Sequence, residues 1–414
     1  MTEEAPPGRS GALPDAAGTV GRAATGGTLA FMALVGICQF LAVVQFLLIG
    51  AYGFWSWVKV GFLTALLSLR ADVVVAVQGP PFFRTASESM TLQWRFVPMA
   101  LTIGFLWLAA RTGRRAVRSG PGRSPLIAAG LAAAGAGVPV AILSAVCSTL
   151  VTLSFPALGL RLRIDTPSAA FWAGILAAVG AGAGAYLEAA RGRVSAAAVR
   201  GGLTAYGWAL GLLAVGVFVV ATLEPAVTRR YADGVTRDGA LGGVLFGYHL
   251  LALPAQSALL LSPASGSCVE IIGEGPMFDL CPWRLVVSGP AGEGYLPQPL
   301  ALSPWLWLLS AVPFVAAMLG GRRAVTGAPA TGEGAAGLGV AAGVMFAFLA
   351  LAGGWVASPQ LFPFLIPVPQ ISVHPEWIRT VITTLLWGVV GGGLGAWFAA
   401  GRYAEPELPR PTSA

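Results

Sequence analysis

The chain has 414 residues, of which 56% are hydrophobic and 10% are charged. Soluble domains carry about 25% charged residues, so this composition excludes an ordinary soluble protein and indicates a protein of the lipid bilayer. The formal net charge of +7 does not indicate nucleic-acid binding, because the arginines cluster just beyond apolar segments, where membrane-topology signals lie.

The first 28 residues are polar and rich in small residues, and they contain no compact apolar core. A cleaved signal peptide needs a basic start that is followed quickly by a short apolar stretch. We therefore expect a disordered cytoplasmic tail over 1–28, after which the first apolar segment acts as its own membrane-insertion signal.

Eight apolar runs approach or exceed the length of about 20 residues that a bilayer crossing requires. They are 29–51, 96–111, 125–154, 168–190, 203–223, 302–320, 336–357 and 377–400. Two further apolar runs are ambiguous: 53–69 carries Lys59 in its middle, and 243–262 carries His249 and a central Pro254. Because proline interrupts the hydrogen-bond ladder of a helix, we expect the run at 243–262 to be broken, as a re-entrant or interfacial element is.

Short basic connections set the expected topology. Cytoplasmic loops carry an excess of Lys and Arg, and this rule places 112–124, 191–202 and 321–335 on the cytoplasmic side of the plasma membrane. Eight spans, with the N-terminus and the tail at 403–414 both inside, satisfy every one of these loops. The basic residues that mark the first and last loops include Arg114, Arg115, Arg322 and Arg323.

One short motif occurs twice: GRRAV at 113–117 returns at 321–325, an offset of 208 residues. Further along, GAYLEAARGR at 184–193 and GAWFAAGRYA at 395–404 match at the similar offset of 211. We therefore expect an internal duplication, with GRRAV as the cytoplasmic turn after the second span of each half. Four spans per half keep both halves the same way up, with their pseudo-twofold axis along the membrane normal.

The expected fold is thus an all-α polytopic membrane protein of about eight transmembrane helices, built as two parallel four-helix repeats. The repeats cover 29–200 and 201–402, and the second includes an extracytoplasmic loop region at 224–301. Each repeat ends in a helix with a GxxxG motif, a spacing that lets two helix backbones approach closely. The glycines of the two motifs are Gly180, Gly184, Gly391 and Gly395.

Two of the four cysteines, Cys268 and Cys281, lie in the loop that is expected outside, where a disulfide can persist. A redox or metal role would favour CxxC spacing or nearby histidines, and neither is present. We expect a structural disulfide that closes a small β-hairpin, whose arms are CVEIIG and WRLVVSG, the second beginning at Trp283. Cys38 and Cys147 lie inside expected spans as small packing residues.

The polar residues of the two ambiguous runs allow two interpretations each. Lys59 either extends its amine to the membrane interface or contributes to a binding site. His249 either packs within a helix or contributes to such a site beside Pro254. The chain has only two histidines, no mid-span acid and no catalytic motif, so we expect no metal, no cofactor and no enzymatic activity.

The segments WVKVGFLTALLSLRADVVVAV, LQWRFVPMALTIGFLWLAARTGRRAV and LLALPAQSALLLSP resemble actinobacterial multi-pass membrane proteins of the PerM-like group. The resemblance spans most of the membrane region, and it implies a permease-like protein associated with cell division. The second outer loop departs from the family pattern in its cysteine pair and its extra length. No catalytic residues come with the resemblance.

The leading hypothesis is therefore a non-enzymatic integral membrane protein that organises or stabilises cell-envelope or division partners through its outer loops. Its expected partners are the lipid bilayer and other membrane or envelope proteins. The alternative is a transporter or lipid-translocating protein, since many carriers combine a duplication with interrupted helices that line a site. A membrane enzyme is the third possibility.

Overall fold

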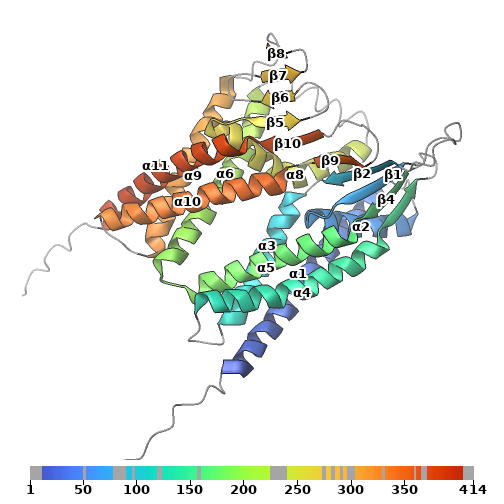
Figure 1. Ribbon diagram of the computed structural model, residues 1–414, viewed down its shortest axis with the longest axis horizontal. Coiled ribbons are helices and arrows are strands. Elements are labelled where there is room, and N and C mark those ends of the chain that lie inside the picture. Colours follow the sequence, from blue (N-terminus) through green and yellow to red (C-terminus); the bar gives the residue numbers. More distant parts are fainter. Residues whose placement is uncertain are drawn as a thin grey trace, which may run out of the picture. The chain divides into compact units, whose positions relative to one another are not determined.

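A computed structural model of the chain divides into two compact units, Met1–Ala190 and Arg191–Ala414. This boundary lies ten residues before the one expected between the repeats. The structure describes residues 12–49, 53–77, 90–95, 98–118, 124–155, 160–223, 240–272, 277–280, 285–289, 292–295, 304–328, 332–358, 360–364 and 371–403. The helices and strands of both units are labelled in Figure 1.

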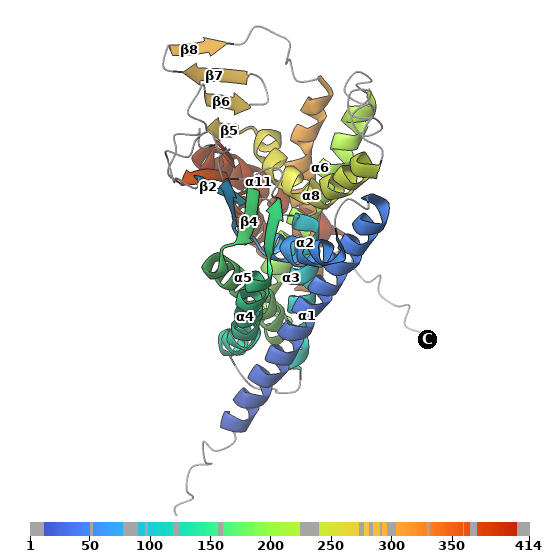
Figure 2. The same cartoon turned by 90° about the vertical axis from the view of Figure 1, so that its right-hand side faces the viewer.

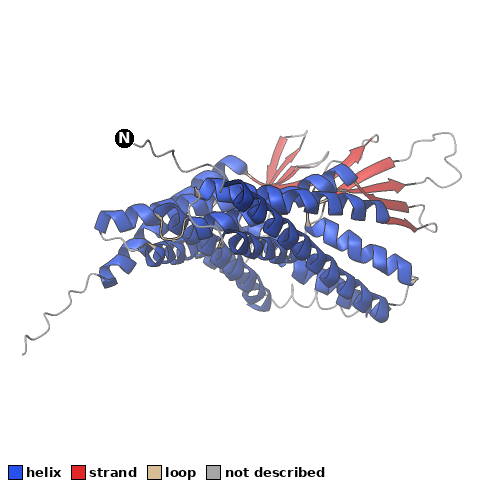
Figure 3. Ribbon diagram, turned by 90° about the horizontal axis from the view of Figure 1, so that it is seen from below, coloured by secondary structure: helices blue, strands red, loops and turns tan. Residues whose placement is uncertain are grey.

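The first unit combines four long helices with one short helix and two pairs of strands. Its helices are α1 (Ala12–Ile49), α2 (Phe54–Ser68), α3 (Met99–Val117), α4 (Pro125–Leu150) and α5 (Thr166–Ala189). Its strands are β1 (Val73–Val77), β2 (Met90–Arg95), β3 (Thr152–Phe155) and β4 (Leu160–Ile164). One pair of strands precedes α3 and the other precedes α5. Figure 3 shows the strands of the protein, in red, at the ends of the helices.

The second unit follows the same order of elements, with additions. Its helices are α6 (Val194–Leu223), α8 (Ala240–Ser265), α9 (Val312–Gly327), α10 (Gly332–Ala357) and α11 (Trp377–Tyr403), and the 3₁₀ helix η4 (Pro304–Ala311) precedes α9. Its strands are β5 (Val269–Ile272), β6 (Met277–Leu280), β7 (Leu285–Gly289), β8 (Gly292–Tyr295), β9 (Gln360–Phe364) and β10 (Ile371–Pro375). Strands β7 and β8 extend the meander that β5 and β6 begin (Figure 2).

The strands of both units pair in the same topology. In the first unit the order is β3-β4-β1-β2, and in the second it is β9-β10-β5-β6-β7-β8, with antiparallel pairing throughout. In each unit, a strand from the connection after the second helix therefore pairs with a strand from the connection before the last helix. The sequence analysis predicted none of the strands of the first unit.

Seven described helices are long and apolar enough to cross a membrane, so the chain is a multi-span membrane protein. They are α1, α4, α5, α6, α9 with the end of η4, α10 and α11. The eighth expected span is α3, a helix of 19 residues that also carries Arg111, Arg114 and Arg115. Because these three charges lie in a short helix, α3 has no sufficiently long apolar stretch and is not among the seven helices.

The structure corrects the prediction of a disordered tail over 1–28. Residues 12–28 are not disordered in the structure, because α1 begins at Ala12. Small residues pack this part of the helix: Ala23 is fully buried, and Gly27 lies against the backbone of Ala136 in α4. Arg22 donates to the carbonyl oxygen of Ala116 near the end of α3, at 3.2 and 3.3 Å. Tertiary packing, rather than apolarity, makes this segment helical.

Two further expectations about helices are also wrong. The run at 243–262 is not broken at Pro254, because α8 continues through this proline and through Pro263. A proline removes one hydrogen bond of the ladder, and a helix that packs against neighbouring helices can tolerate that loss. The two GRRAV segments are not turns either, since 113–117 ends α3 and 321–325 lies inside α9.

The expected hairpin differs in its pairing. The predicted arms correspond to β5 and β7, but these strands do not pair with each other, because β6 lies between them. The missed strand is the segment Met277–Leu280, which the GEGP sequence at 273–276 separates from β5. Gly and Pro in such a linker favour a chain reversal, so the segment between the cysteines supplies both strands of its own hairpin.

Candidate functional site

Strand β4 of the first unit carries two exposed arginines on one face. Its sequence LRLRI alternates, and successive side chains of a strand point to opposite faces. Ile164 is buried against Leu66, Val73 and other residues at the strand end of the helices. Arg161 and Arg163 are exposed on the opposite face. The strand is therefore apolar toward the helices and basic on its outer face.

Hydroxyl side chains on the neighbouring strand β3 extend this surface. In the register of the β3–β4 pair, Thr152 stands opposite Arg163, and Ser154 stands opposite Arg161. Residues directly opposite in an antiparallel pair share a face. Among the described residues, neither arginine forms an ion pair. We call Thr152, Ser154, Arg161 and Arg163 the basic sheet face.

A hollow of about 290 Å³ adjoins the basic sheet face where α4 ends and α5 begins. The Ser148 hydroxyl donates to Thr166 Oγ1 at 2.8 Å on its wall, and Asp165 Oδ2 accepts from the backbone N–H of Ser168 at 3.0 Å, which caps α5. The hollow is lined by Ser148, Thr149, Val151, Thr152, Arg163, Ile164, Asp165, Thr166 and Pro167. Its polar groups and the guanidinium of Arg163 suit polar or anionic contacts.

Lys59 lies beside the same surface. Its side chain is half-buried on α2, and Nζ donates to the carbonyl oxygen of Thr152 at 3.0 Å. Helix α2 is itself held to α1, because Gln39 Nε2 donates to the carbonyl oxygen of Val58 at 2.9 Å. Lys59 thus joins α2 to the start of β3, and the structure adds its positive charge to the edge of the basic sheet face.

A buried junction fixes the other side of this sheet to the helices. Arg70, between α2 and β1, is only 1% exposed, has a φ of 65°, and places its guanidinium 4.2 Å from the ring centre of Trp172 on α5. Asp72 Oδ2 accepts a hydrogen bond from the Ser168 hydroxyl at 3.0 Å, and its backbone carbonyl accepts from the N–H of Asp165 at 2.9 Å. These contacts join residues next to the ends of β1 and β4 to α5, and they hold the sheet in a defined orientation.

The GxxxG glycines lie where the last helix of each unit crosses another helix. A Cβ at Gly180 of α5 would stand 2.8 Å from the Cβ of Ala109 in α3. A Cβ at Gly391 of α11 would stand 2.9 Å from the Cβ of Ala317 in α9. One turn further on, Gly184 and Gly395 are closer still to the opposing backbone, and a side chain there would overlap a carbonyl oxygen.

The glycines of GRRAV serve the same crossings from the other helix. Gly113 of α3 lies against the carbonyl oxygen of Ala181 in α5, and Gly321 of α9 lies against that of Gly392 in α11. This contact explains why GRRAV is helical. Its glycine is needed for close approach rather than for a turn. The arginines that follow are exposed in both helices, at Arg114, Arg115, Arg322 and Arg323.

The other predicted site residues lie in the second unit. Pro254 is half-buried in α8, and His249 belongs to the same helix, but its side chain lies outside the described residues, as do Trp283 and Cys281. Cys268 is 3% exposed, and its carbonyl oxygen accepts from the Ser262 hydroxyl at 2.8 Å and from the N–H of Glu376 at 2.9 Å.

The predicted disulfide stays a prediction because Cys281 is not described, although the free cysteines among the described residues are Cys38 and Cys147 alone. The register pairs Val269 with Leu280, which are the chain neighbours of the two cysteines. In the sequence, each of the two cysteines that are expected to bond therefore stands next to one residue of this cross-strand pair.

Arg161 and Arg163 were not predicted as site residues from the sequence. The signal was present in the LRLRI pattern, which alternates strictly over five residues, as half-buried strands do. It was hidden because the pattern lies between two long apolar runs.

Comparison with known proteins adds no relative: no family model matches the chain, and neither a curated protein nor a solved structure matches it.

Proposed function

We propose that this protein is a non-enzymatic organiser of the cell envelope that holds partner proteins through the outer surface of its first unit. The observation that carries the proposal is the exposed pair Arg161 and Arg163, on a sheet that Arg70 and Asp72 anchor firmly to the helices. Exposed charges that form no ion pair among the described residues favour an acidic segment of a partner, because charge complementarity guides and orients association.

The proposal includes an internal duplication, and recurring contacts support it. The crossing of α3 with α5 uses the pairs Gly113–Ala181, Gly180–Ala109 and Gly184–Ala110, and that of α9 with α11 uses Gly321–Gly392, Gly391–Ala317 and Gly395–Met318. In these pairs, each α3 residue corresponds to an α9 residue at an offset of 208, and each α5 residue corresponds to an α11 residue at an offset of 211. The common strand topology of the two units supports the same conclusion.

Further repeated contacts lie where the short second helix leads into a strand. In both units a backbone N–H donates to a carbonyl oxygen of this helix. Ala71 donates to Leu66, and Ser267 donates to Ser262, so the two pairs are separated by an offset of 196 residues. The residue before each donor has a positive φ, Arg70 in one case and Gly266 in the other. Agreement in such local detail is expected of two descendants of one ancestral unit.

The proposed location is the plasma membrane, with both termini and the basic ends of α3 and α9 in the cytoplasm. Positive charge at these ends supports it, since Arg114, Arg115, Arg322 and Arg323 are all exposed there. In this topology α3 is the eighth span, and the strand connections of each unit lie outside the cell. The resemblance to the PerM-like group suggests cell division as the process in which the partners act.

A transporter or lipid-translocating protein is the second candidate. It is favoured by the duplication together with α8, which contains both Pro254 and Pro263. Prolines weaken a membrane helix locally, and many carriers place such helices beside the substrate. In that case a small molecule or lipid, rather than a protein, would accompany the purified chain.

The decisive experiment is co-purification of the full chain from its native membrane in a mild detergent. The wild type is compared with an Arg161→Gln, Arg163→Gln double variant and with a matched Arg114→Gln, Arg115→Gln double variant at the other end of the unit. We expect stoichiometric partner proteins with the wild type and the matched variant, and their loss with the first variant. Equal recovery with all three rejects the basic sheet face as the contact surface, and a bound small molecule without partners favours transport.

A further inference from the structure

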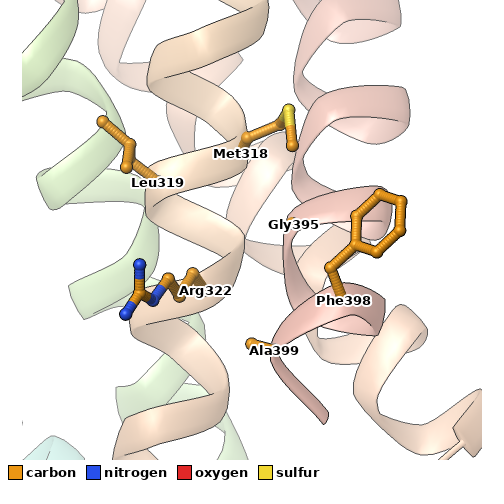
Figure 4. A pocket seen from close by; sticks show the side chains of 6 residues that line it. All are labelled: Met318, Leu319, Arg322, Gly395, Phe398 and Ala399. Atoms are coloured by element: carbon orange, nitrogen blue, oxygen red, sulfur yellow. The ribbon is translucent and has the colours of Figure 1, made fainter. Parts of the chain in front are cut away.

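A groove between α9 and α11 of the second unit has apolar walls and a basic residue. Its volume is about 330 Å³, at the lower end of the range for small-molecule sites. It is lined by Met318, Leu319, Arg322, Gly395, Phe398 and Ala399 (Figure 4). Both helices are long and apolar enough to cross a membrane, so the groove opens along a surface suited to lipid.

Small residues on α11 create the groove. Gly395 lies against the carbonyl oxygen of Met318, and Ala399, one turn later, is only 7% exposed. Phe398 is 58% exposed and forms one wall. Figure 4 shows Leu319 and Arg322 projecting from the same side of α9, one helical turn apart. An apolar chain could therefore follow α9 while a negative group reaches the guanidinium.

The first unit has an ion pair at the corresponding place. At offsets of 211 and 208, Ala399 and Thr326 correspond to Glu188 and Arg118, and Arg118 Nε lies 3.1 Å from Glu188 Oε1. Leu319 likewise corresponds to Arg111. The second unit has therefore exchanged a charged, internally paired surface for an apolar groove.

This exchange leaves positive charge beside the groove. Arg322 and Arg323 are exposed, and among the described residues neither forms an ion pair. Glu188, which pairs with Arg118 in the first unit, is replaced by alanine at 399. Basic pockets between membrane helices are a common means of holding anionic lipid head groups.

We propose that this groove binds an anionic phospholipid, with the phosphate at Arg322 and one acyl chain along Met318, Leu319 and Phe398. The site is independent of the partner surface on the first unit, and it does not depend on which leaflet meets this end of α9. Its structural consequence is that a lipid occupies the groove beside the α9–α11 crossing, where the first unit has the ion pair of Glu188 and Arg118.

Native mass spectrometry of the full chain in a neutral detergent tests the proposal. The protein is titrated with phosphatidylglycerol and with phosphatidylcholine of the same acyl chains. We expect tighter binding of phosphatidylglycerol, weakened about fivefold by Arg322→Gln, which is the contribution of one basic residue near an anionic surface. Ala399→Glu should weaken it similarly, because it restores the acid of the first unit.

Two controls make the result decisive. Arg114→Gln changes the counterpart arginine of the first unit and should leave phosphatidylglycerol binding unchanged, and Arg322→Lys should retain most of it. Thermal unfolding without lipid shows whether each variant is folded. If Ala399→Glu does not fold, the test rests on Arg322→Gln, which changes a side chain on the helix surface. Equal binding of the two lipids to the wild type, or equal losses from Arg114→Gln and Arg322→Gln, overturns the proposal.

Discussion

Gly184 of α5 lies against the carbonyl oxygen of Ala110 in α3, so close that a Cβ at this glycine would overlap the oxygen. Gly395 of α11 meets the carbonyl oxygen of Met318 in α9 in the same way. Close backbone approach without large side chains is the means by which membrane helices associate when no hydrophobic effect drives them together. In each unit, this helix crossing therefore requires a glycine, because only a side chain of one hydrogen atom fits at the contact.

The first prediction concerns these crossings. Gly184→Ala and Gly395→Ala should each lower the free energy of unfolding by about 1–3 kcal/mol, because the helices must separate to admit a methyl group. Gly104→Ala in α3 is the matched control, since nothing lies within 4 Å of its added Cβ and alanine favours a helix. The measurement is thermal unfolding in detergent. Equal unfolding temperatures for Gly184→Ala and Gly104→Ala would contradict the packing argument.

The second prediction is the topology. Single cysteines placed at Ser119 and Thr326, in the basic segments that follow GRRAV, should resist an impermeant thiol reagent added to intact cells. A cysteine at the exposed Ser154 of β3 is the positive control and should react. The background is a chain without its four native cysteines. Labelling at Ser119 or Thr326 would require a different number of spans.

The third prediction is the Cys268–Cys281 bridge. The intact mass before and after reduction and alkylation should differ by the amount that one disulfide requires. Its loss in a Cys281→Ser variant should cost about 2–5 kcal/mol of stability, since the bridge restrains the unfolded chain. Free thiols at both positions in the non-reduced protein would exclude the bridge. They would also argue against an extracytoplasmic location of the hairpin.

The fourth prediction separates the two functional hypotheses through a deletion phenotype. If the protein organises partners through the basic sheet face, His249→Ala should complement the deletion, while the Arg161→Gln, Arg163→Gln double variant should impair complementation. A carrier predicts the reverse order, because polar groups near the membrane would contact the substrate. Membrane levels of every variant must be equal for the comparison. A stable but inactive His249 variant, together with an active Arg161→Gln, Arg163→Gln variant, would reject the organiser hypothesis.

Much of the helical frame could be predicted from the sequence. Apolar runs locate seven helices of spanning length, and α3 is recognisable as a short helix that ends in arginines. The GxxxG spacing at Gly180 and Gly391 marks helices that cross a neighbour closely. These features follow from local rules, because a helix forms its hydrogen bonds within one segment, and hydropathy reports the length of that segment.

Tertiary contacts decided the rest. Strand β1 pairs with β4 through Val73 and Ile164, which are 91 residues apart in the sequence, and this pairing exists only because the helices bring the two connections together. Arg161 and Arg163 become an outer surface only in that sheet. Likewise, the start of α1 at Ala12 and the helical state of GRRAV rest on glycine and alanine contacts with other helices. Sequence periodicity determined which segments are apolar and helical, whereas contacts between distant segments determined the sheet, the crossings and the charged surface, because their energy depends on residues that are not neighbours in the chain.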